Sequence, residues 1–197
     1  MTETRAPKAS EAASTLPRLE AGELILRLME DRDVEDLLTM WGDPETMRFM
    51  SGDPLKDRQE GLRFIEDIRT SVRARTLYQW GFALAEDDRV VGTCTLASLD
   101  WRHLTCEIGF ALAPAHRRRG LTSRAVARVL EHAFSDLGMR RVEADVDPRN
   151  TPSLRLLERQ GFVREGLLRA RYLEADEVQD ALMLGLLAEE WREGREA

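Results

Sequence analysis

The spacing of apolar residues changes along the chain, and each spacing predicts a type of secondary structure. Before residue 78, one short apolar run is followed by apolar positions that recur every three or four residues, which indicates a strand and then helices. From Tyr78 onward, large apolar residues alternate with smaller ones, which predicts an antiparallel meander. The elements expected in this half are a strand at 24–28, helices opening at Glu30, at Pro44 and over 57–75, and strands at 78–84, 89–99 and 106–112.

The second half alternates between helical and strand patterns. Amphipathic spacing predicts a helix over 122–137 that Gly138 ends, followed by a strand at 142–146. A second helix is expected to open at Asn150 and to stop at Gly161. Two further strands, at 162–171 and 178–187, are expected to close the chain as a hairpin.

This order of elements predicts a single α/β domain over residues 21–197. We expect one mixed, mostly antiparallel central sheet of about seven strands with helices on both faces. Residues 1–20 lack apolar periodicity and are expected to form a flexible N-terminal tail.

Composition narrows the class of protein. Hydrophobic residues make up 43% and charged residues 33% of the 197 positions, as in an ordinary globular domain. No apolar run approaches the length of a membrane span, and the charged N-terminus does not resemble a secretory signal, so we expect a cytoplasmic protein without membrane contact. Cys94 and Cys106 are not in a CxxC spacing and are expected to be reduced and buried.

Charge and histidine spacing limit the partners and cofactors. The net charge of −7 counts against nucleic acid as a direct ligand and suits a cationic partner, such as an amine. His103, His116 and His132 lack metal-ligand spacing with one another or with the cysteines, so no metal is expected. The oligomeric state is not readable from the pattern, and a homodimer stays open.

The segment from Glu107 to Ser123 carries the most chemical information. A strand runs into a basic loop that contains Gly120, and the loop runs into a helix. Unpaired N–H groups and a partial positive charge at a helix N-terminus bind anions, and a glycine lets the backbone approach a ligand closely. Thr122 or Ser123 can cap the helix or donate a hydroxyl hydrogen bond, and a diphosphate suits such a loop. The alternative interpretation is a solvated arginine turn before an ordinary helix; the loop is not a P-loop, because the GxxxxGK spacing is absent.

Four segments, in sequence order over about residues 22–192, resemble the GNAT N-acetyltransferase superfamily. Residues 117–122 resemble its acetyl-CoA pyrophosphate signature, and Asn150 with Ser153 and Gly161-Phe162 resembles its second cofactor segment. Arg27 with residues 43–49, and the ending at 186–191, resemble the branch that acetylates the N-termini of ribosomal proteins. The resemblance implies a GNAT-like fold, acetyl-CoA as cosubstrate and coenzyme A as product.

Three positions depart from the family pattern. Thr122 stands where the signature has Gly or Ala, and Arg118 stands where Gly is frequent. Leu157 occupies the position at which many members carry a tyrosine that protonates the departing thiolate. The ribosomal branch places a serine at the position of Ser153, so the resemblance implies Ser153 as the acid or as a cofactor contact.

The resemblance also implies roles for the residues around the loop. The backbone of Phe110, Ala111 and Leu112 would pair with the pantetheine arm, which a gap between this strand and the one at 142–146 would admit. The residues implied to bind the rest of the cofactor are Arg117, Arg118, Arg119, Gly120, Leu121, Thr122, Ser123 and Asn150. The helix N-cap role of Asn150 is compatible with a cofactor contact.

Glu107 is the candidate general base. Side chains alternate along a strand, so Glu107 lies on the face opposite to Ile108, Phe110 and Leu112. A carboxylate near the acetyl group can accept the proton of the attacking amine. Asp145 on the next strand is the second candidate for this role. A solvent-facing or salt-bridged strand glutamate remains the structural alternative.

The predicted activity is transfer of an acetyl group from acetyl-CoA to a primary amine by direct attack in a ternary complex. The acceptor is either a protein N-terminal α-amine, as in the ribosomal branch, or a small-molecule amine. A non-catalytic acetyl-CoA sensor on the same fold is the alternative. Residues of the first two helices are candidates for lining the acceptor groove, with Tyr172 at its mouth; they are Trp41, Met47, Phe49 and Met50.

Overall fold

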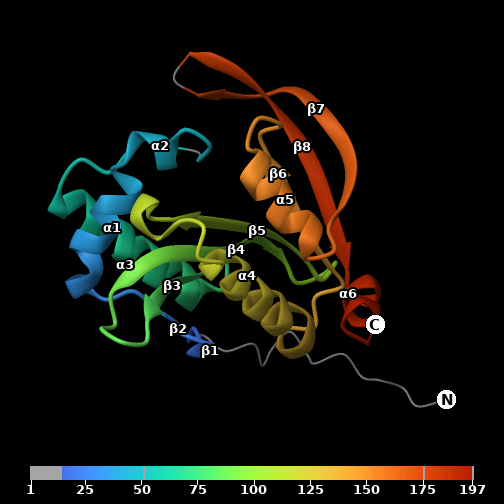
Figure 1. Ribbon diagram of the computed structural model, residues 1–197, viewed down its shortest axis with the longest axis horizontal. Helices are drawn as coiled ribbons and strands as arrows, with labels where there is room; N and C mark the ends of the chain where they lie inside the picture. The colour runs from blue at the N-terminus through green and yellow to red at the C-terminus, as the bar shows by residue number, and fades with distance from the viewer. Residues whose placement is uncertain (1–14, 51, 175, 197) are drawn as a thin grey trace.

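The computed structural model describes residues 15–50, 52–174 and 176–196. In that part of the chain, eight strands form one sheet in the order β1-β2-β3-β4-β5-β6-β8-β7 (Figure 1). The β5–β6 pair is parallel and the other neighbouring pairs are antiparallel. The strands are β1 (Leu19–Ala21), β2 (Leu24–Arg27), β3 (Tyr78–Leu84), β4 (Val90–Asp100), β5 (Thr105–Leu112), β6 (Arg141–Val146), β7 (Val163–Glu174) and β8 (Glu177–Leu187). The predicted fold class, a mixed and mostly antiparallel sheet with helices, is confirmed.

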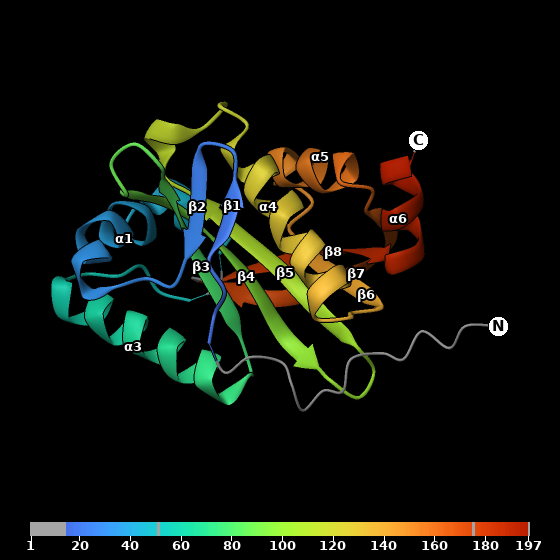
Figure 2. The ribbon, with the colours of Figure 1, turned by 90° about the horizontal axis from the view of Figure 1, so that it is seen from below.

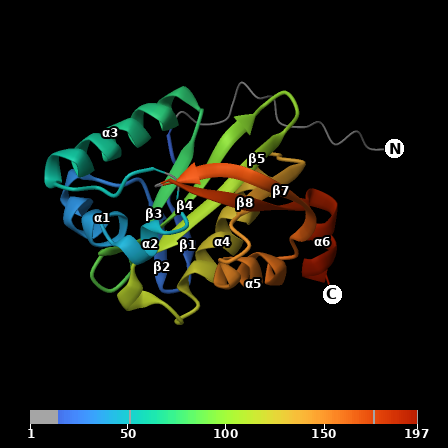
Figure 3. The same ribbon diagram turned by 90° about the horizontal axis from the view of Figure 1, so that it is seen from above.

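Helices flank this sheet, and one hairpin arches over it. Helix α4 contacts β1, β2, β4 and β5, and it lies in front of the sheet when the molecule is seen from below (Figure 2). Seen from above, the β7–β8 hairpin crosses in front of β4 and β5, so it lies on the opposite side of the sheet from α4 (Figure 3). The helices are α1 (Val34–Trp41), α2 (Pro44–Met47), α3 (Arg58–Ala74), α4 (Leu121–Glu131), α5 (Thr151–Arg159) and α6 (Ala188–Glu196), with a short 3₁₀ helix at Asp31–Asp33.

The core is centred on β3, whose seven residues are all buried. Aromatic side chains bury large apolar areas, and Tyr78, Trp80 and Phe82 are among the largest fully enclosed side chains in the domain. The indole Nε1 of Trp80 donates a hydrogen bond to the carbonyl oxygen of Pro17 at 2.9 Å, which fastens the residues before β1 to the core. The alternating aromatic pattern from Tyr78 onward therefore identified the centre of the sheet.

One buried ion-pair network joins the first helices to the β3–β4 turn. Arg27 is 6% exposed, and its guanidinium donates two hydrogen bonds to the Asp33 carboxylate, at 2.7 and 2.9 Å, and one to the Asp88 carboxylate at 2.9 Å. The hydrogen bonds to Asp33, and then those to Asp88, hold the pKa of Arg27 above its usual value despite its burial. The bidentate pair fixes the start of α1 against β2, because a buried charge is tolerated only when it is paired.

The structure differs from the sequence-based boundaries at the β1 edge of the sheet and at α4. Residues 1–14 of the predicted tail lie outside the described residues, whereas Leu19 and Glu20 belong to β1, which pairs with β2. Only one residue of this three-residue strand is buried, so it leaves no periodic signal. Helix α4 begins at Leu121 with Gly120 as its N-cap, and its last turn over 132–136 is π-helical. The prediction that Thr122 or Ser123 caps this helix was therefore wrong, because the left-handed Gly120 turns the chain into the helix first.

Three further observations limit the class of protein and its chemistry. Cys94 and Cys106 are buried free thiols, as expected. Within the described ranges, no helix combines the length and apolar character that crossing a bilayer requires. The same ranges hold no group of three or more His, Cys, Asp or Glu side chains that could bind a metal ion.

Candidate active site

The loop between β5 and α4 has two left-handed residues just before the helix. Arg118 has φ 64° and Gly120 has φ 74°, and the helix begins at Leu121. Glycine adopts a positive φ without steric cost, whereas any other L-residue is strained there. The frequent glycine at the position of Arg118 is thereby explained: the backbone needs this conformation, and arginine adopts it at a cost. The first N–H groups of α4 follow directly, which is the backbone arrangement that an anion site requires.

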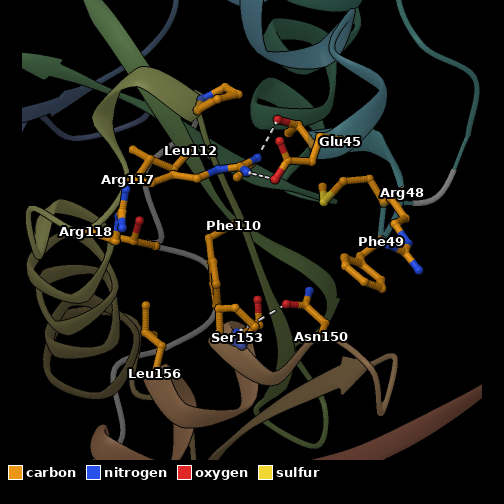
Figure 4. Close-up of a pocket in the computed structure, with 16 residues that line it drawn as sticks. Glu45, Arg48, Phe49, Phe110, Leu112, Arg117, Arg118, Asn150, Ser153 and Leu156 are labelled. Atoms are coloured by element: carbon orange, nitrogen blue, oxygen red, sulfur yellow. Dashed lines mark hydrogen bonds and ion pairs between the residues drawn. The ribbon is translucent and has the colours of Figure 1, made fainter.

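The three loop arginines point to different partners. Arg117 pairs with Glu45 of α2 and donates to the hydroxyl oxygen of Thr46 at 3.1 Å, so it bridges the loop to the first helices (Figure 4). Arg118 lines a cavity next to the loop. Arg119 instead contacts His116 at 3.3 Å and Glu23 at 3.5 Å, away from that cavity.

The cavity has a volume of about 660 Å³ and lies between three segments of the chain (Figure 4). Its walls come from α2 and the turn after it, from β5 with the loop and α4, and from the start of α5. The lining residues are Glu45, Thr46, Arg48, Phe49, Met50, Phe110, Ala111, Leu112, Pro114, Arg117, Arg118, Thr122, Asn150, Pro152, Ser153 and Leu156. Segments separated by about 100 residues therefore enclose one site.

Eight of the predicted site residues meet at this cavity, and five do not line it. Those that line it are Phe110, Ala111, Leu112, Arg117, Arg118, Thr122, Asn150 and Ser153; those that do not are Glu107, Arg119, Gly120, Leu121 and Ser123. Leu121 is fully buried, so it can offer a ligand only its backbone N–H. The hydroxyl oxygen of Ser123 accepts a hydrogen bond from Gln160 Nε2 at 3.0 Å, which ties α4 to α5.

The sequence pattern did not predict most of the residues on the α2 side of the cavity. Phe49 and Met50 line it as expected, but Met47 is buried and Trp41 packs against Phe64 with ring centroids 5.1 Å apart. Glu45, Thr46 and Arg48 were not singled out. The one sequence feature that could have indicated these three residues is their position in segment 43–49, which resembles the family.

Helix α5 places its polar N-terminus at the cavity. The Asn150 side-chain oxygen accepts a hydrogen bond from the Ser153 backbone N–H at 3.3 Å, so Asn150 is the N-cap. Leu157, at the position of the family tyrosine, is fully buried in the core. Ser153 is therefore the hydroxyl side chain that α5 offers to the cavity.

Strands β5 and β6 part beside this cavity. They pair only over Thr105–Glu107 and Arg141–Glu143 in the described structure, although β5 continues to Leu112 and stays paired with β4. The backbone groups of β5 beyond Glu107 consequently have a side that no neighbouring strand of the sheet occupies. An extended chain can bind to such an edge by main-chain hydrogen bonds.

Glu107 lies where the two strands part, among other carboxylates. Burial raises the pKa of Glu107, and the charges of Asp145 and Glu143 raise it further, while Arg171 opposes them. The Tyr172 hydroxyl donates to Asp145 at 2.6 Å, so this hairpin residue borders the same place. A carboxyl group with a raised pKa is a stronger proton acceptor, which suits a general base.

Comparison with known proteins agrees with this geometry. A family model described as Acetyltransferase (GNAT) domain matches residues 23–163. The uncharacterized N-acetyltransferase p20 of Bacillus licheniformis is 33% identical over 168 residues, which cover 85% of this chain and 94% of that protein. The ribosomal-protein-serine acetyltransferase of Escherichia coli is 28% identical over 109 residues, or 53% of this chain and 61% of that one.

A solved structure shows the same fold. The spermidine N-acetyltransferase of Vibrio cholerae, in complex with CoA and spermine, superposes with a TM-score of 0.77 at 20% identity, over 86% of this chain and 98% of that one. The family match spans most of the chain, and the relative from Bacillus licheniformis covers nearly the whole domain. The chain therefore belongs to the GNAT acetyltransferase family and is an N-acetyltransferase.

Proposed function

We propose that the protein transfers the acetyl group of acetyl-CoA to a primary amine by direct attack within a ternary complex. One observation carries the proposal: a single cavity joins the loop at the start of α4 to Phe110–Leu112, the stretch of β5 that β6 leaves unpaired. A diphosphate fits the N–H groups of the loop with Arg117 and Arg118 beside them, and an extended pantetheine arm fits the free side of β5.

The attacking amine has to lose a proton, and Glu107 is the proposed acceptor for it. An α-amine has a pKa of roughly 8 and a lysine amine roughly 10.4, so an α-amine needs less help near neutral pH. Glu107 stands at the last paired position before the strands separate, which is the inner end of the proposed cofactor groove. Its raised pKa suits proton transfer from an ammonium group.

The leaving thiolate needs little acid assistance, because a free thiol has a pKa of roughly 8.5. Ser153 lines the cavity, and its proposed role is to donate a proton or to contact the cofactor. Neither cysteine suits an acetyl-enzyme intermediate, since burial raises the pKa of both the Cys94 and the Cys106 thiol. Direct transfer is therefore the proposed route.

The acceptor is proposed to be a protein N-terminus or a small-molecule amine. A relative of Escherichia coli is named for a ribosomal protein, and the structural neighbour from Vibrio cholerae is named for spermidine. The α2 side of the cavity, where Glu45 pairs with Arg117 and Phe49 lines the wall, is proposed to discriminate between them.

The test is release of coenzyme A thiol when acetyl-CoA is mixed with a panel of N-terminal peptides and small amines. We expect turnover with at least one acceptor and a fall of about 100-fold in kcat/KM for Glu107→Gln. Unchanged turnover in that variant would contradict the base role. A sensor would bind acetyl-CoA and release no thiol with any acceptor.

The loop assignment has a separate test. Gly120→Glu places a bulky negative charge at the proposed diphosphate site, so we expect coenzyme A binding, measured by calorimetry, to be lost. Gly194→Glu, on α6, is the matched control and should bind as the wild type does. Tight binding by Gly120→Glu would show that the diphosphate lies elsewhere.

A further inference from the structure

Three carboxylates share one face of the sheet where β5 and β6 part. Glu107 and Glu143 are direct partners in the parallel pair, and Asp145 follows Glu143 by two residues, so its side chain points to the same face. On the other side of β5, the partner of Glu107 in β4 is Ala97, which carries no charge. The charged and titratable groups that face Glu107 are thus Glu143 and Asp145 from β6, and Arg171 and Tyr172 from β7.

The two carboxylates of β6 differ in how their charges are compensated. Glu143 accepts a hydrogen bond from Arg141 Nε at 2.7 Å, and its side chain is 40% exposed. Both the cation and the solvent therefore weaken its effect on Glu107. The Asp145 side chain is only 8% exposed, and Arg171 Nε lies 4.0 Å away, at the limit of an ion pair.

Asp145 is held mainly by a neutral donor. The Tyr172 hydroxyl donates to Asp145 Oδ2 at 2.6 Å, a short and strong hydrogen bond to a carboxylate. Burial and this hydrogen bond both raise the pKa of Tyr172, so the phenol keeps its proton near neutral pH. A neutral donor fixes the carboxylate in place without cancelling its charge.

We propose that Asp145, held by the hydroxyl group of Tyr172, is a positioning residue that governs proton transfer from the acceptor amine to Glu107. The proposal rests on the base role of Glu107. In the transfer, the acceptor R–NH₃⁺ gives one proton to the Glu107 carboxylate, which leaves a neutral amine and a neutral carboxylic acid. A fixed negative charge beside Glu107 favours this outcome, because protonation of one carboxylate relieves the repulsion between two. The β7–β8 hairpin thereby contributes to the chemistry through Tyr172.

The two variants Asp145→Asn and Tyr172→Phe should move the pH profile of kcat/KM in opposite directions. Asn removes the negative charge, so the midpoint of the acid limb should fall by about one pH unit and the plateau rate by about threefold. Phe removes the O–H dipole that partly screens the Asp145 charge, so that charge acts more strongly on Glu107 and the acid limb should move upward. Glu143→Gln is the matched control, and the midpoint of its acid limb should stay within about 0.3 pH units of that of the wild type.

An Asp145→Asn profile that moves no further than that of Glu143→Gln overturns the proposal. If the Asn variant does not fold, as judged by circular dichroism, Tyr172→Phe decides alone, and an unmoved acid limb overturns the proposal. A carbon NMR titration of the Glu107 carboxyl group in the wild type and in both variants gives the same comparison without turnover. Failure of the base role would instead appear as full activity in Glu107→Gln, so the two results are distinguishable.

Discussion

Replacement of Gly120 by alanine isolates the free-energy cost of the backbone conformation in the loop between β5 and α4. Gly120 has φ 74°, and a Cβ atom built there meets no atom of the described residues within 4 Å. The substitution therefore creates no clash within the protein, and its cost comes from the left-handed backbone alone. An L-residue in this conformation is destabilised by about 1–2 kcal/mol. Alanine has fewer conformations than glycine in the unfolded chain, and this smaller entropy of unfolding offsets roughly 0.4–1 kcal/mol of the cost. The free energy of unfolding should therefore fall by about 1 kcal/mol in total.

Urea denaturation followed by circular dichroism measures this loss. With a slope of about 2 kcal/mol/M, the midpoint should fall by about 0.5 M, and the melting temperature should fall by about 2–4 °C. Gly194→Ala is the control, because Gly194 also has open space around its Cβ position but lies in α6 without a positive φ. There, alanine should stabilise by about 0.5–1 kcal/mol. Equal midpoints for Gly120→Ala and the wild type would refute the claim that φ requires glycine.

Three more outcomes follow from buried charged and titratable groups. Arg27→Ala leaves Asp33, 3% exposed, without its bidentate partner, so urea denaturation should show a loss of about 3–5 kcal/mol; a loss below about 1 kcal/mol would contradict a buried network. Burial raises the pKa of the Cys106 thiol to about 12 and that of Cys94 above its usual value, so a colorimetric thiol reagent should detect neither at pH 7.5 until the protein unfolds. The Glu107 pKa is raised in the folded state, so its ionisation lowers stability as pH rises through and above the unfolded value of roughly 4.3. Glu107→Gln should therefore melt at a higher temperature than the wild type at pH 7 and at the same temperature at pH 4.

Elements with a strong periodic signal were predicted closely. The alternation that begins at Tyr78 gave β3 with the observed bounds, and Asp57, predicted at the start of the long helix, is its N-cap. The strand β1 and the helix α6 were missed. β1 has one buried residue, and α6 is a largely polar helix that packs on β8, so neither carries an apolar stripe of its own.

The candidate site was predicted where a motif is local and missed where it depends on the fold. Phe110, Arg117 and Ser153 belong to contiguous segments with family-like spacing, and all three line the cavity. Glu45 approaches Arg117 across 72 residues of sequence, and no local pattern encodes such a contact. The different paths of Arg118 and Arg119 also depend on backbone conformation, because the left-handed residue turns one side chain toward the cavity and the next toward Glu23.

The parting of β5 and β6 also affects how the domain holds together. In the described structure, three residue pairs are the whole sheet connection between the half made of β1 to β5 and the half made of β6 to β8. The hydrogen bond from Gln160 to Ser123 crosses the same boundary, because it joins the end of α5 to α4. Backbone amides in the two halves should therefore exchange with solvent as two cooperative units rather than one. An extended chain bound in the gap would act as the missing strand and join the two units into one.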